Sequence, residues 1–129
     1  MSIMYYSHFS DSGKEWALEY FSPVELASNG DGSLKLDIEA GLKLDCLREM
    51  MGSPLIVNSA YRDPIYNAKV GGAPMSLHKF GKAFDISIIG IDKFELSKNA
   101  KIVGFTGFGY YNSFLHVDTG KPRQWGKIW

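Results

Sequence analysis

The chain has 129 residues, a length typical of one domain, and we predict a single domain over residues 1–129. Hydrophobic residues make up 45% of the sequence and charged residues 22%, values that exclude an intrinsically disordered protein. The formal net charge is +0, so the molecule as a whole has no electrostatic attraction to nucleic acid, and we expect no nucleic-acid partner. The single cysteine, Cys46, excludes a disulfide framework, and its place in a helical pattern predicts a buried thiol.

The first part of the chain contains two predicted helices and a strand. Ser22 and Glu25 form a capping box, which predicts a short helix from Pro23 to about Ser28. Asp37 can cap a longer helix that ends near Met51, because apolar side chains recur there at intervals of four, three and four residues. The apolar run over residues 55–57 predicts a short buried strand.

The second part of the chain alternates between strands and helices. We predict helices over residues 63–70 and 92–103, each capped by its first aspartate, and a strand over residues 83–88. Two further strands, over residues 107–111 and 114–118, are predicted to form a hairpin. These elements predict an α+β fold, in which a small antiparallel sheet has helices on one face and a polar groove on the other.

Strand alternation predicts which side chains share the polar groove. Asp85 lies on the polar face of its strand, and His116 and Asp118 lie on the polar face of theirs. This alternation makes Asp85 and His116 candidate neighbours. The side chains predicted to face the core are those of Phe84, Ile86, Ile88, Leu115 and Val117.

Two histidines and one aspartate form a candidate metal site. Neutral imidazole suits zinc, and a carboxylate oxygen can complete the ligand set. His78, Asp85 and His116 would supply three ligands and leave a fourth position for water, as in catalytic zinc sites. From spacing alone, a hydrogen-bonded structural role remains open for each histidine. The third histidine, His8, lies in a polar stretch that we expect to be a solvated tail.

The segment from Ser76 to Asp85 fits the pattern S-x-H-x-x-G-x-A-x-D. Five such fixed positions occur in a chain of this length by chance with a probability on the order of 10⁻⁴. The pattern resembles the zinc peptidases of the D-Ala-D-Ala carboxypeptidase and murein endopeptidase group, the LAS metallopeptidases, including phage endolysins of one domain. Residues 59–72 and 109–125 also look like segments of this family. The resemblance covers about residues 20–126.

The resemblance implies a zinc peptidase that hydrolyses an amide bond in peptidoglycan stem peptides, with zinc held in the groove by His78, Asp85 and His116. Arg62 matches an arginine that faces the substrate, and its guanidinium can grip a peptide carboxylate; a surface ion pair is the alternative. Ser76 would contact the substrate or orient His78, unless it only shapes a loop.

For the general base, this chain departs from the pattern of the family. Relatives place a carboxylate or a histidine at positions that are Ser113 and Phe114 in this chain. Asp118 is the nearby carboxylate, so it is either the catalytic base or an acceptor that orients His116. Tyr110 is a candidate substrate-binding residue, because it or its neighbour could donate a hydrogen bond to an oxyanion.

Ser113 stands where relatives carry a carboxylate and cannot act as a base. A second function therefore stays open, that of a non-catalytic, zinc-stabilised module that binds the cell wall or belongs to a phage particle. A zinc dipeptidase or amidase acting on small free peptides is a third reading. No stretch reaches the roughly 18 apolar residues of a membrane span, and residues 1–16 lack the features of a secretory signal. We therefore expect a monomer that is made in the cytoplasm and reaches the wall through lysis or a phage particle.

Overall fold

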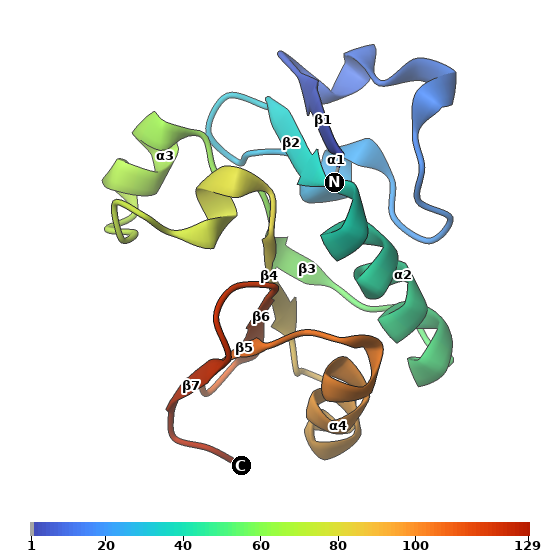
Figure 1. The fold of residues 1–129 in the computed structure, drawn as a ribbon, viewed down its shortest axis with the longest axis vertical. Coiled ribbons are helices and arrows are strands. Elements are labelled where there is room, and N and C mark those ends of the chain that lie inside the picture. The colour runs from blue at the N-terminus through green and yellow to red at the C-terminus, as the bar shows by residue number, and fades with distance from the viewer. Residues whose placement is uncertain (1) are drawn as a thin grey trace.

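A five-stranded sheet lies at the centre of the computed structural model, which describes residues 2–129. In Figure 1 this sheet lies between a small two-stranded sheet at the upper end of the molecule and helix α4 at the lower end. The strand order of the larger sheet is β3-β4-β6-β5-β7. Its strands are β3 (Val57–Ser59), β4 (Ala83–Ser87), β5 (Gly107–Tyr110), β6 (Phe114–Asp118) and β7 (Arg123–Gly126). The α+β class predicted from the sequence is confirmed.

The larger sheet is mixed, which corrects the prediction of a purely antiparallel sheet. Strand β7 pairs in parallel with β5, whereas the other neighbours pair antiparallel. The chain leaves β6 through a short loop and returns along the free edge of β5, where the Arg123 amide donates to the Thr106 carbonyl. A second sheet, formed by β1 (Ile3–Tyr6) and β2 (Leu34–Asp37), was not predicted either.

Aspartate caps begin three of the helices at the predicted residues. The side chain of Asp37 accepts from the backbone at the start of α2 (Ile38–Met51), and Asp63 and Asp92 do the same for α3 (Pro64–Lys69) and α4 (Lys93–Val103). The capping box of α1 (Pro23–Leu26) is also present, although this helix ends before the predicted Ser28. Strand β3 begins two residues later than predicted.

The apolar core lies between the larger sheet and helices α2 and α4, which pack against each other (Figure 1). The predicted core face of β4 and β6 is confirmed, because its side chains in those strands are at most 1% exposed. Cys46 is exposed, contrary to the prediction of a buried thiol. Its place two residues after Leu44 turns it about 200° around α2, away from the buried stripe. The core side chains of the strands are Phe84, Ile86, Leu115 and Val117.

The N-terminal segment is folded, which corrects the expectation of a solvated tail. Strand β1 pairs with β2, and His8 Nδ1 accepts from the Ser10 amide to cap the 3₁₀ helix η1 (Phe9–Asp11). The His8 ring is exposed but packs so closely over Gly32 that a Cβ there would lie 2.8 Å from it. Within residues 2–129, no helix has the length and apolar character needed to cross a membrane.

Candidate metal centre

The register of β4 and β6 makes Asp85 and His116 directly opposite partners. His116 Nδ1 lies 2.9 Å from Asp85 Oδ1, and His78 Nε2 lies 3.2 Å from the same oxygen. One donor atom from each of the three residues lies within 4.8 Å of the others, and all three residues are buried. The structure therefore brings together the three predicted zinc ligands.

His78 is held by the short helix η3 (Leu77–Phe80), whose N-cap is Ser76. The Ser76 hydroxyl accepts from the His78 amide at 3.3 Å, and η3 ends at Gly81 with φ 70°. A side chain at Gly81 would collide with the carbonyl of Lys35, so this close approach requires glycine. His78 Nδ1 lies 2.6 Å from the Ala60 carbonyl, which can only accept. Nδ1 therefore carries a hydrogen, and Nε2 is the nitrogen that faces Asp85.

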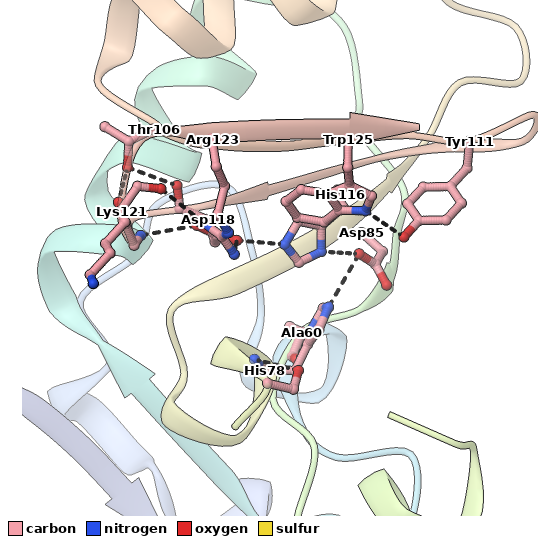
Figure 2. A network of polar contacts seen from close by, with 12 residues as sticks. Ala60, His78, Asp85, Thr106, Tyr111, His116, Asp118, Lys121, Arg123 and Trp125 are labelled. Carbon is pink, nitrogen blue, oxygen red and sulfur yellow. Dashed lines mark hydrogen bonds and ion pairs between the residues drawn. The ribbon is translucent and has the colours of Figure 1, made fainter. Parts of the chain in front are cut away.

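His116 is held from the other side by Asp118, as Figure 2 shows. His116 Nε2 donates to Asp118 Oδ2 at 2.7 Å, which leaves Nδ1 for the cluster. Asp118 is 0% exposed and accepts three further hydrogen bonds, two from the Arg123 guanidinium and one from the Gly120 amide. The Asp118 carboxylate is thus fixed by its neighbours, and it in turn fixes the His116 ring.

The electrostatics of this network favour a cation. Burial alone would raise the pKa of Asp85, but hydrogen bonds from His116 and His78 outweigh it and hold this pKa well below its usual range. For Asp118, burial is likewise outweighed by hydrogen bonds from His116 and Arg123, and the pKa is lowered. Burial alone would lower the pKa of His116, but its bonds to Asp118 and Asp85 raise it. Two ionised carboxylates around one imidazole therefore attract either a proton or a metal ion.

A groove of about 450 Å³ opens over this cluster, and Arg62 and Ser76 line it together with the three candidate ligands. Arg62 Nη2 lies 3.3 Å from Asp85 Oδ2, and its other nitrogens donate to Ser59 Oγ at 3.1 Å and Asn67 Oδ1 at 3.4 Å. Its side chain is 17% exposed. Arg62 is therefore oriented by three partners and still borders the groove.

The structure does not bring Tyr110 into this groove. Tyr110 pairs with Leu115 in the sheet and points toward the core, where its side chain is 3% exposed. The neighbouring Tyr111 lines the groove instead, stacks on Phe114 with ring centroids 4.3 Å apart, and accepts from Trp125 Nε1 at 2.9 Å. The alternation of β5 separates these two tyrosines, because Phe108 and Tyr110 share its core face.

Several residues of the site were not predicted from the sequence. Arg123 and Trp125 reach the groove from β7, and their spacing of two residues was the available signal that they share a face of a strand. Gly107 and Gly109 of β5 lie opposite Asp118 and His116 in the sheet. A Cβ at Gly107 would collide with Asp118 and Arg123, and one at Gly109 would lie 2.7 Å from the Trp125 ring. These glycines give the buried network its space.

The donor set fits zinc, since two imidazole nitrogens and one carboxylate oxygen are the ligands of many catalytic zinc sites. The family model for Peptidase M15 matches residues 19–118, a range that contains all three donors. The chain is 37% identical over 89 residues to the zinc D-Ala-D-Ala carboxypeptidase of Streptomyces albus G, an alignment that covers 64% of this chain and 35% of that protein.

A second relative is the peptidoglycan L,D-endopeptidase MepK of Escherichia coli K12. It is 34% identical over 99 residues, which cover 68% of this chain and 54% of that protein. The chain thus spans between a third and about half of the length of these relatives. The family predicted from the sequence motifs is confirmed, and with it zinc as the cofactor of that family. By the match over most of its length, the chain belongs to the Peptidase M15 family.

Proposed function

We propose that the chain is a zinc peptidase that hydrolyses an amide bond in peptidoglycan stem peptides. One observation carries this proposal: three buried donors, His78 Nε2, Asp85 Oδ1 and His116 Nδ1, converge beneath an open groove in a member of a peptidase family. The names of both relatives support peptidoglycan as the substrate class, one as a D-Ala-D-Ala carboxypeptidase and the other as an endopeptidase. The groove is lined by Asp85, His116 and Asp118, the polar side chains of β4 and β6, which supports the proposal that zinc is held there.

His78, Asp85 and His116 would hold the zinc ion. When bound in such a site, zinc supplies a Lewis acid that polarises a carbonyl and activates a water molecule near neutral pH. The Ala60 carbonyl keeps the hydrogen of His78 on Nδ1, and Asp118 keeps a hydrogen of His116 on Nε2. Each imidazole therefore presents the nitrogen that faces the cluster, without a change of tautomer.

For Asp118 we propose the positioning role rather than that of the general base. Its carboxylate is fully buried, and both oxygens already accept hydrogen bonds from His116, Arg123 and the Gly120 amide. A general base has to reach the proton that it removes, directly or through one water. The contacts of Asp118 lead instead to the ring of His116, whose orientation they fix.

Arg62 and Tyr111 are the proposed substrate contacts. The Arg62 guanidinium borders the groove and carries the planar donor pair that matches a peptide carboxylate. The Tyr111 oxygen accepts from Trp125, so its own hydrogen stays free to donate to a substrate oxygen. Ser76 caps η3 and accepts a hydrogen bond from the His78 amide, which supports a role in orienting His78.

We further propose that the chain is a monomer and that it reaches the cell wall through lysis or a phage particle.

The test is the digestion of purified peptidoglycan by the zinc-loaded chain, with and without a chelator. We expect soluble fragments to appear, to stop appearing with chelator and to return when zinc is added back. Mass spectrometry of the fragments identifies the bond that is cut, and thereby separates endopeptidase from carboxypeptidase activity. Binding to peptidoglycan without any release of fragments would contradict the proposal and favour a non-catalytic wall-binding module.

A further inference from the structure

A second pocket, of about 370 Å³, lies next to the metal groove and shares one wall residue, Tyr111, with it. We call it the lysine pocket. It is formed by the start of α4, the end of β5 and the last residues of the chain. The residues that define it are Lys93, Phe94, Tyr110, Tyr111, Lys127 and Trp129.

The lysine pocket combines two cations with an aromatic surface. Lys93 Nζ lies 5.0 Å from the ring centroid of Trp129 and 5.4 Å from that of Phe94. Within residues 2–129, neither Lys93 nor Lys127 has a carboxylate at ion-pair distance. Two ammonium groups without an acidic partner raise the local concentration of anions, and the aromatic rings beside them suit a ligand that is also partly apolar.

The hydroxyl of Tyr110 is a second, independent feature of this pocket. Tyr110 lines the pocket, yet its hydroxyl is buried and has no hydrogen-bond partner in the part of the chain that the structure describes. Leaving a buried hydroxyl without a partner is unfavourable. A polar group of a ligand would supply the missing hydrogen bond once binding shifts the residues that cover this hydroxyl.

We propose that the lysine pocket binds a carboxylate-bearing part of the peptidoglycan stem peptide, on the far side of Tyr111 from the bond that is cut. This inference rests on the proposed function, because it assigns a subsite to the same substrate. Tyr111 borders both pockets, so a peptide that bends around Tyr111 at the end of β5 would run from the zinc ligands to the lysines beside α4. A free carboxylate is the group of such a peptide that two unpaired ammonium groups attract.

The test compares a double variant of the pocket, Lys93→Gln with Lys127→Gln, with a matched control, Lys14→Gln with Lys98→Gln. Both pairs remove the same charge, and the control lysines are exposed and outside both pockets. Dissociation constants are measured for soluble muropeptides with free carboxylates, in the presence of a chelator that prevents hydrolysis. We expect the pocket variant to bind about fivefold to thirtyfold more weakly than wild type, and the control variant to bind as wild type does.

Amidated muropeptides identify the group that is recognised. When the carboxylates are converted to amides, we expect the pocket variant and the control variant to bind equally, because Lys93 and Lys127 then have no carboxylate to attract. Tyr110→Phe should also weaken binding of the free-acid ligand without lowering the melting temperature, because it removes a hydroxyl that has no partner among residues 2–129. Equal dissociation constants for the pocket and control variants would overturn the lysine pocket.

Hydrolysis by the zinc-loaded proteins is scored separately, so that the two proposals can fail independently. If the pocket variant binds more weakly than the wild type, but the zinc-loaded wild type releases no fragments, the proposed function is refuted and the subsite stands. Chelator-sensitive hydrolysis with equal dissociation constants in all variants would refute the lysine pocket and leave the peptidase standing.

Discussion

The two faces of strands β4 and β6 are both buried, but they carry opposite chemistry. On one face lie Phe84, Ile86, Leu115 and Val117, each at most 1% exposed. On the other face Asp85, His116 and Asp118 are at most 8% exposed and are joined by hydrogen bonds. Because the faces alternate residue by residue along the same strands, a substitution on one should change the stability of the fold, and a substitution on the other the affinity for metal.

Removal of a core side chain should have the largest effect. Leu115→Ala leaves a cavity in the core, on the face of β6 opposite His116, and should lower the free energy of unfolding by about 2 to 5 kcal/mol. The zinc content of the folded variant should equal that of wild type. Urea unfolding measures the first quantity and metal analysis the second. The exposed Leu42→Ala is the control and should change stability little. Loss of zinc from folded Leu115→Ala would show that the two faces are not independent.

Asp118→Asn tests the polar face. If Asp118 positions His116, the variant should bind zinc about 10- to 100-fold more weakly, with turnover near normal once zinc is saturating. A zinc titration and a hydrolysis assay at saturating zinc measure the two effects. Asp92→Asn makes the same chemical change at a helix cap and should leave zinc affinity unchanged. Normal zinc affinity combined with a loss in turnover of roughly 10²-fold would instead identify Asp118 as the general base.

Arg62→Lys addresses the border of the groove. Lysine keeps the charge but loses the planar donor pair that matches a substrate carboxylate and that Ser59, Asn67 and Asp85 orient at the border of the groove. We expect kcat/KM on stem peptides to fall by about tenfold or more, with little change in the melting temperature. Arg48→Lys on the surface of α2 is the control. A lower melting temperature with an unchanged kcat/KM would reduce Arg62 to a structural ion pair.

The pH dependence of the metal-free chain should be a smaller effect with a definite sign. His116 has a raised pKa in the fold, so its contribution to stability is complete below its unfolded pKa of about 6.5 and is lost as the pH rises through the folded pKa. Melting temperatures with chelator should therefore fall above about pH 6.5. Asp85 and Asp118 have lowered pKa values, and their contribution is lost only in acid, below about pH 4.

The control for this pH dependence is His116→Gln, which should abolish the fall above neutral pH. With zinc present, the melting temperature should no longer fall in this pH range. The metal and the proton compete for the same imidazole, so zinc affinity should rise with pH. A wild type and a His116→Gln variant with the same pH profile would contradict the raised pKa of His116.

The sequence predicted those parts of the site that follow from local rules. Alternation along residues 83–88 and 114–118 predicted that Asp85 and His116 would be neighbours, and the register of β4 and β6 confirms it. The aspartate caps of α2, α3 and α4 were predicted because the cap is a contact between residues two or three apart. Such contacts do not depend on how distant segments meet.

The unpredicted parts depend on distant contacts. Strand β7 has only four residues, mostly exposed and polar, so it carries no apolar alternation; it is held by pairing with β5 and by the bonds of Arg123 to Asp118. The space for this network comes from Gly107 and Gly109, whose importance appears only when the side chains opposite them are known. The wrong prediction for Tyr110 has a different cause. Its alternation with Phe108 was visible in the sequence and already placed both side chains on the core face of the strand.

The central claim, that the polar face of β4 and β6 together with η3 holds one zinc ion, is tested most directly by metal analysis after zinc loading and dialysis. We predict about one zinc per chain in the wild type and none in His116→Ala or His78→Ala, as expected for a site with three protein ligands. His8→Ala, which removes the histidine outside the cluster, should retain the full zinc content. Full zinc occupancy in His116→Ala would contradict the account.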